Sequence, residues 1–213
     1  MRHICYKIFE NEKFAKDFVE GRIYFSAAGE FIKAKDSERR YDEGFVEIKG
    51  QKLVIDGIEL DIPYKVGYSE LKRVPIFCFS MIDTSNSAIL DNNLMLGIPN
   101  KNKTLGGYLV VFELEKLLDG LEKVLLPHGF GIRMQKVEYV DFDREPTEKW
   151  QEKVNEPLDI LFLHDAKHKN QNEARIVITL GLYNEGTKGQ IFEINDWSVL
   201  EYKELIGENN NGE

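Results

Sequence analysis

Residues 173–180, with the sequence EARIVITL, constrain the fold of this chain more than any other stretch. Ile176, Val177 and Ile178 are β-branched, and such residues favour strands. Side chains alternate between the two faces of a strand. One face carries the apolar set Ala174, Ile176, Ile178 and Leu180. The other carries Glu173, Arg175, Val177 and Thr179. The pattern therefore predicts a core strand whose second face opens with two charged side chains.

Glu173 and Arg175 are two residues apart, which on a strand separates them by about 7 Å. A carboxylate and a guanidinium at the mouth of a buried strand are typical of a functional site. The same pair on a solvated face is an ordinary ion pair, worth about 0–1 kcal/mol. The spacing alone leaves both interpretations open.

Composition excludes some classes of function. The 213 residues carry a formal net charge of −9, with a pI near 5.1. Non-specific nucleic-acid binding requires an excess of clustered Lys and Arg, and this chain has none overall. The acidic balance also argues against binding to an anionic membrane surface, and no apolar run reaches the length of a membrane span. We expect no membrane association.

The cysteines and histidines predict free thiols and no metal site. Cys5 and Cys78 lie outside any CxxC motif or Cys/His cluster, so a structural zinc site is not expected. His164 and His168 are four residues apart and would share one face of a helix, but His3 and His128 supply no third ligand. The first residues do not form a signal peptide, which predicts a reducing, cytoplasmic setting.

Hydrophobic periodicity predicts most of the secondary structure. Strands are expected at 4–9, 23–26, 74–80, 105–113, 130–140, 173–180 and 190–200, and helices at 10–21, from residue 114 onward and at 145–162. Gly21 is expected to cap the first helix. Residues 27–44 are predicted to be an irregular charged loop. A β-meander is predicted at 45–62, where Asp56-Gly57 is a strong hairpin signal.

These elements predict an α+β fold with a mixed, strongly bent sheet or a split β-sandwich and flanking helices. We expect one domain over residues 1–205, with the β-meander at about 45–65 as an elaboration. Residues 206–213 are polar and are predicted to be a disordered tail.

Four local patterns, taken in order, resemble a known bacterial family. Tyr6-Lys7 on the first strand is followed by a helix and by residues 23–26 (IYFS). Phe31 precedes residues 36–44 (DSERRYDEG), residues 77–80 read FCFS, and residues 172–176 (NEARI) follow Lys167. Together these patterns resemble the family catalogued as domain of unknown function 2971. The chain departs from it at Tyr41, where the family often has Gly, and lacks the Trp-containing segment expected after residue 80.

The layout is also similar, more remotely, to the ADP-ribosyltransferase superfamily. That resemblance implies an NAD-linked transferase or glycohydrolase, with a toxin or phage-defence role. NAD would be the substrate, and the partner a small-molecule nucleotide or a protein acceptor. Tyr6 or Lys7 would hold NAD, Ser26 would support the nicotinamide pocket, and Glu173 would bind the nicotinamide ribose. Either Arg40 or Arg175 would pair with the pyrophosphate, and the cofactor-binding loop would also include Asp42 and Glu43.

Two other functions remain open. In a non-enzymatic binding module, residues 27–44 would recognise a ligand or a protein, and Glu173 and Arg175 would form a structural ion pair. In a metal-dependent nuclease, an acidic cluster would comprise Asp36, Asp42, Glu43 and Glu173, with Lys65 or Lys167 assisting.

Overall fold

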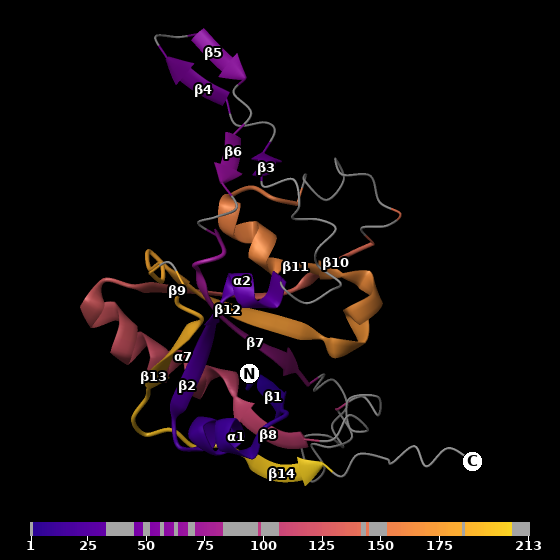
Figure 1. Ribbon diagram of the computed structural model, residues 1–213, viewed down its shortest axis with the longest axis vertical. Coiled ribbons are helices and arrows are strands. Elements are labelled where there is room, and N and C mark those ends of the chain that lie inside the picture. The colour runs from indigo at the N-terminus through magenta and orange to yellow at the C-terminus, as the bar shows by residue number, and fades with distance from the viewer. Residues whose placement is uncertain are drawn as a thin grey trace.

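The computed structural model describes residues 2–32, 71–82, 98, 107–141, 144, 153–184 and 186–205, together with the backbone of four short strands between residues 45 and 67. Its fold is a mixed α+β arrangement dominated by an antiparallel sheet, with few helices among the described residues (Figure 1). The fold class is therefore confirmed at this level.

The main sheet has eight strands in the order β13-β2-β7-β1-β8-β14, and β12 pairs with both β7 and β9. Its strands are β1 (Ile4–Phe9), β2 (Arg22–Ala27), β7 (Pro75–Met81), β8 (Gly107–Glu113), β9 (Gly131–Lys136), β12 (Glu173–Thr179), β13 (Gly189–Glu193) and β14 (Glu201–Leu205). The main helices are α1 (Glu12–Val19) and α7 (Leu114–Leu125). Figure 1 shows β7 and β12 side by side near the middle of the fold.

β7 pairs with two strands along one of its edges. Its Pro75 end pairs with β2, where Ser26 opposes Ile76, and its Met81 end pairs with β1, where Tyr6 opposes Ser80. The whole strand pairs with β12 along the other edge. β1 and β2 therefore part from each other beside the middle of β7, and we call this place the strand split.

One face of the sheet carries the main core. It is rich in aromatic side chains, because the alternating residues of β7 and β8 on this face include Phe77, Phe79 and Phe112. Phe18 of α1 stacks on Phe77 at a ring-centroid distance of 5.6 Å and packs edge-on against Trp197 at 5.3 Å. α1 and α7 bury their apolar sides against this face, which secures the sheet at its centre.

The opposite face carries two smaller apolar clusters. One includes Ile4 and Tyr6 of β1 with residues of β8, and the other includes Ile76, Val177 and the segment 160–163. The 3-10 helix η3 (Pro157–Phe162) and the start of the short strand β11 (Leu163–Asp165) contribute to this second cluster. A second 3-10 helix, η4 (Ala166–Gln171), follows β11. β11 pairs in parallel with β10 (Glu138–Val140).

Most of the predicted core elements are confirmed. The strands at 4–9, 23–26, 74–80 and 105–113 and the two predicted helices at 10–21 and from residue 114 onward all form. The strand predicted at 173–180 forms as far as Thr179, but the prediction that Leu180 lies on its core face is wrong: Leu180 has φ 61°, which ends the strand, and is 89% exposed. Gly21 has φ +86° and its N–H donates to the Phe18 carbonyl, so its predicted capping role is also confirmed. Cys5 and Cys78 are free thiols, Cys5 buried and Cys78 partly so.

Four predictions were wrong in detail. Residues 28–32 form α2 (Ala28–Ile32) where a loop was expected. The predicted strand at 130–140 is two strands, β9 and β10, with different partners. Of the helix expected at 145–162, residues 145–152 lie outside the described residues, 153–156 are not helical, and 157–162 form the 3-10 helix η3, which Pro157 starts and the Asp159 side chain caps by accepting the Glu156 N–H. The strand expected at 190–200 ends at Glu193, and the last strand is β14.

The predicted β-meander is a nested pair of hairpins instead. β4 (Lys52–Ile55) and β5 (Ile58–Asp61) pair on either side of Asp56-Gly57, as the hairpin signal indicates. β3 (Phe45–Ile48), however, pairs with β6 (Tyr64–Gly67) and not with β4. The predicted tail at 206–213 and most of the 27–44 loop lie outside the described residues.

Two backbone hydrogen bonds close the point where the chain leaves the main sheet after β2 and returns before β7. Ala28 N–H donates to the Val74 carbonyl at 2.9 Å, and Gly29 N–H donates to the Lys72 carbonyl at 2.9 Å. The two ends of the intervening chain are therefore held side by side.

Candidate active site at the start of β12

Glu173 is the first residue of β12, and the backbone before it sets its position. Asn172 adopts a left-handed conformation with φ 45°, which ends η4 and turns the chain into the strand. Its side-chain amide donates to the Met81 carbonyl at 2.6 Å, and its own carbonyl accepts the Met81 N–H at 3.0 Å. Asn tolerates this conformation better than most residues. The turn therefore attaches the start of β12 to the end of β7.

The register of the sheet places Tyr6, Ser80 and Glu173 directly opposite one another on β1, β7 and β12. Opposed residues on neighbouring antiparallel strands have their side chains on the same face. Tyr6 is only 2% exposed. Two of the predicted catalytic residues, Tyr6 and Glu173, therefore share one face with a single strand between them.

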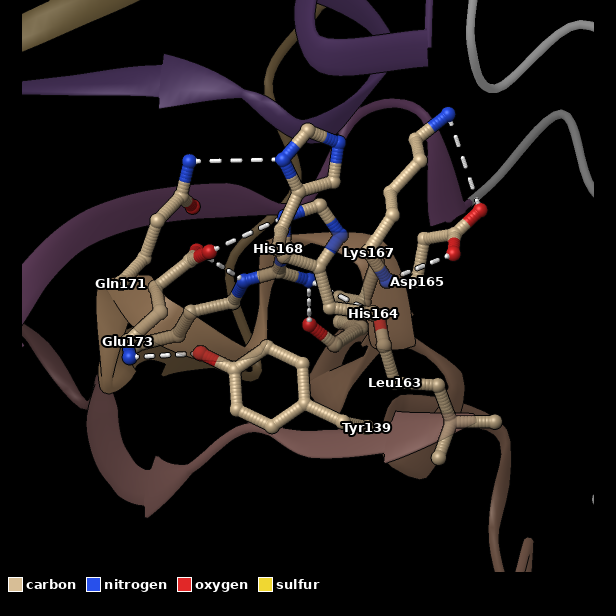
Figure 2. Close-up of polar contacts among 10 residues, drawn as sticks. Tyr139, Leu163, His164, Asp165, Lys167, His168, Gln171 and Glu173 are labelled. Atoms are coloured by element: carbon tan, nitrogen blue, oxygen red, sulfur yellow. Dashed lines mark hydrogen bonds and ion pairs between the residues drawn. The ribbon is translucent and has the colours of Figure 1, made fainter. Parts of the chain in front are cut away.

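The Glu173 carboxylate is largely buried and has partners at both oxygens. Oε1 accepts from Arg175 Nε at 2.7 Å, and Oε2 lies 3.3 Å from His164 Nε2 (Figure 2). The Cys78 thiol also lies close to this carboxylate and helps to lower the pKa of Glu173. Only 11% of the Glu173 side chain and 14% of the Arg175 side chain are exposed. The two residues form a buried ion pair and not a solvated one.

Arg175 also binds the segment that covers this face. Its Nη1 donates to the Leu161 carbonyl at 2.5 Å and to the Leu163 carbonyl at 3.3 Å. The guanidinium thus links the strand to η3 and β11 while it holds Glu173. In these contacts Nε and Nη1 of Arg175 bind groups of the protein itself. The predicted pairing of Arg175 with a pyrophosphate stays a prediction.

The backbone of Glu173 is anchored as firmly as its side chain. Its N–H donates to the Tyr139 hydroxyl at 2.8 Å, and its carbonyl accepts the Val137 N–H at 2.9 Å. Val137 lies at the break between β9 and β10, so this break serves to bring Tyr139 beneath Glu173 (Figure 2). Such fixed surroundings keep a carboxylate in one place without reorganisation.

Electrostatics keep this carboxylate ionised. Burial alone raises the pKa of Glu173, but the Arg175 charge, its hydrogen bond and His164 together hold that pKa below its usual value. The neighbouring Cys78 behaves oppositely, since burial and the Glu173 charge raise the pKa of its thiol to about 12. The site therefore presents a carboxylate anion beside a neutral thiol.

Lys7 lies on the other face of β1, at the strand split. Its Nζ donates to the Cys78 carbonyl at 2.5 Å and lies 4.7 Å from the centre of the Phe77 ring. Burial lowers the pKa of Lys7, although Cys78 and Glu173 oppose the shift. The Lys7 ammonium thus donates a hydrogen bond within the protein at the strand split. The predicted contact of Lys7 with NAD stays a prediction.

Ser26 is not brought together with Glu173. It opposes Ile76 on β7, and Ile76 opposes Val177, four residues along β12 from Glu173. That offset corresponds to about 13 Å along the strand. The strand register therefore gives no support for the predicted role of Ser26 in a nicotinamide pocket beside Glu173. The predicted residues Arg40, Asp42 and Glu43 lie outside the described residues.

Sequence reasoning missed His164 and Tyr139 as partners of Glu173. The signal for His164 was its spacing from His168, which indicated a shared helix face. In the structure the two residues lie on β11 and η4, and their rings stack 4.8 Å apart. Within the described residues, no three His, Cys, Asp or Glu side chains are grouped to hold a metal ion.

The structure and the chain were also compared with what is known elsewhere. None of the helices in the described ranges combines the length and the apolar character needed to cross a bilayer. Comparisons with protein-family models, with curated proteins and with solved structures find no match to this chain.

Proposed function

We propose that this protein cleaves the N-glycosidic bond of NAD, releasing nicotinamide and passing the ADP-ribosyl group to water or another acceptor. The observation that carries the proposal is the Glu173 carboxylate, which is ionised, largely buried and held at both oxygens. Loss of nicotinamide leaves an oxocarbenium-like cation on the ribose. A fixed carboxylate stabilises that cation without first having to shed water.

Two further features support the proposal. Tyr6 shares the face of Glu173, with only β7 between their strands. β1 and β2 part at the strand split beside β7, which is compatible with the bent or split sheet that the sequence predicts. Arg175 and Tyr139 act as positioning residues, because they touch Glu173 and its backbone.

The test is nicotinamide release from NAD by the purified protein, with and without cell lysate as a source of acceptor. We expect Glu173→Gln to lower the rate by about a thousandfold, as removal of one transition-state charge partner does elsewhere. The matched control is Glu113→Gln, since the Glu113 side chain is also 11% exposed but pairs with Arg2 and Lys116 at the end of β8, which β1 and β7 separate from β12.

The control must keep wild-type turnover, and circular dichroism must show both variants folded. A folded Glu173→Gln variant with unchanged turnover would contradict the role of Glu173. A wild-type protein that releases no nicotinamide and shows no NAD-induced shift in melting temperature would remove the proposal itself.

One observation favours a second function, that of a non-enzymatic binding module. Arg175 bonds both to Glu173 and to two backbone carbonyls, which is what a purely structural ion pair would do. In that case Glu173→Gln lowers the melting temperature and no chemistry is lost, so the same experiment separates the two functions.

A further inference from the structure

His164 is the one imidazole in contact with the Glu173 carboxylate among the described residues. It lies on β11, and its ring stacks on His168 of η4 with an interplanar angle of 9° (Figure 2). The side chain is 27% exposed, whereas that of Glu173 is 11% exposed. His164 therefore stands between the buried carboxylate and solvent.

The carboxylate determines which ring nitrogen of His164 carries the proton. An ionised carboxylate only accepts hydrogen bonds, so its place 3.3 Å from Nε2 favours the neutral tautomer with the proton on Nε2. Nδ1 lies on the other side of the ring and keeps a lone pair. A carboxylate that orients an imidazole in this way is the arrangement found in general-base dyads.

The surroundings keep the ring neutral. Burial lowers the pKa of His164 to about 4. The negative charges of Glu173 and Asp165 oppose that shift, and the positive charges of Arg175 and His168 reinforce it. The titratable and charged groups on the elements around the ring are Glu173 and Arg175 on β12, Tyr139 on β10, Asp165 on β11, and Lys167 and His168 on η4. At neutral pH the ring is therefore uncharged and has a free lone pair, although it is a weaker base than an ordinary imidazole. A weak base is sufficient where the attacking O–H becomes acidic as it bonds to an oxocarbenium-like carbon.

We propose that Nδ1 of His164 accepts the proton of the nucleophile that attacks the ribose, and that this nucleophile is an O–H compound, either water or a hydroxyl group. The inference rests on the proposed cleavage of NAD. A hydroxyl must lose its proton as it attacks, which a neutral, oriented imidazole can assist. A cationic acceptor such as a guanidinium is disfavoured, because Arg175 already places a positive charge beside the ring.

The step balances in atoms and charge. The bond between ribose C1 and the nicotinamide nitrogen breaks, and its electron pair leaves with nicotinamide as a neutral molecule. The nucleophile oxygen bonds to C1, and its O–H bond breaks. The proton goes to Nδ1, and the resulting imidazolium is paired with Glu173 until it releases the proton to solvent.

The experiment is chemical rescue with azide, an anion that attacks carbon without having to lose a proton. His164→Gln keeps a side-chain N–H donor for Glu173 but removes the base. We expect it to lower nicotinamide release in water and in methanol–water mixtures by about a hundredfold. Added azide should restore release to within a few-fold of wild type and yield ADP-ribosyl azide. Glu173→Gln should not respond to azide.

The matched control is His3→Gln, which removes a second histidine–glutamate contact, His3 Nδ1 to Glu115 Oε1 at 2.7 Å, at an exposed position. It should behave as wild type. Nitrogen-15 NMR of the resting protein gives a second measurement, in which His164 should carry its proton on Nε2 at pH 7.

The outcomes separate the two proposals. Full turnover in His164→Gln, a loss that azide does not rescue, or a proton on Nδ1 overturns the role of His164 and leaves that of Glu173 intact. A wild-type protein that releases no nicotinamide with water, methanol or azide overturns the proposed function and the role of His164 with it.

Discussion

Two arginines on neighbouring strands show how similar contacts serve different purposes. Arg133 of β9 and Arg175 of β12 both reach from the same face of the sheet to the segment 155–165. Arg133 pairs with Glu156 and Asp159 and lies over the Phe162 ring at 4.9 Å. Arg175 pairs with a carboxylate on its own strand and uses backbone carbonyls to reach the segment.

The difference lies in what the carboxylates do. Burial would raise the pKa of Asp159, but the N–H groups of Glu156 and Asn155 and the Arg133 guanidinium lower it and occupy its oxygens. Two backbone N–H groups and the Arg133 guanidinium thus hold both of its oxygens and fix the start of η3. Glu173 Oε2 instead has a longer contact, 3.3 Å to the neutral imidazole of His164, which is the proposed base. We infer that Asp159 is structural and that Glu173 is available for chemistry.

The largest effect expected from this comparison is on stability at the Arg133 site. Asp159→Ala leaves the Arg133 guanidinium without its most buried partner and removes the cap of η3, at a cost of about 3 kcal/mol. Glu173→Gln keeps an acceptor for Arg175 and should cost about 1 kcal/mol. Urea unfolding measures both free energies. Equal losses would mean that both carboxylates are structural.

The next effect concerns acid. The folded pKa of His164 is about 4 and its ordinary value is 6.5, so in that window the unfolded chain binds more protons and stability falls as pH falls. After allowance for the partial exposure of the ring, the loss between pH 6.5 and 4 is about 2 kcal/mol. His164→Gln should remove this part of the slope, measured as melting temperature against pH. Parallel curves for the two proteins would show that His164 titrates normally.

Glu173 adds to acid sensitivity at lower pH. Its pKa is lowered in the folded state, so its contribution is present above its ordinary value of 4.5 and is lost as pH falls below it. The two windows are adjacent, and the comparison between wild type and His164→Gln isolates the upper one.

The smallest effect expected is at the strand split. Lys7→Met removes the donor to the Cys78 carbonyl but also the cost of holding a buried ammonium, so a net loss of about 1 kcal/mol is expected. Nicotinamide release should stay within a few-fold of wild type if Lys7 is structural. A large rise in the Michaelis constant for NAD with unchanged stability would instead support the predicted contact between Lys7 and NAD.

The elements that could be predicted from the sequence are those with a strong pattern of hydrophobic residues. β1, β7 and β12 alternate clearly, because each presents one face to the aromatic core. β11 was missed, and β10 was not separated from β9, because strands of three residues carry too little period and pair here with a distant segment. The last strand was misplaced because β14 shows no apolar alternation until Leu205.

The candidate site was predicted only in part, for a similar reason. Glu173 and Arg175 belong to one strand, so their shared face follows from alternation. His164, Tyr139 and Cys78 come to Glu173 from three other strands, and which residues meet there depends on the register of the sheet. Local patterns do not specify register between distant strands.

The two backbone hydrogen bonds at Ala28 and Gly29 have a consequence for the evolution of this chain. They hold the chain just after β2 beside the chain just before β7, so the two points at which residues 33–70 join the main sheet are already adjacent. Lengthening or shortening a segment attached in this way adds little closure entropy to the fold. Genetic gain, loss or exchange of sequence between these two points would therefore leave the sheet and Glu173 in place, and new specificity could be acquired there without rebuilding the site.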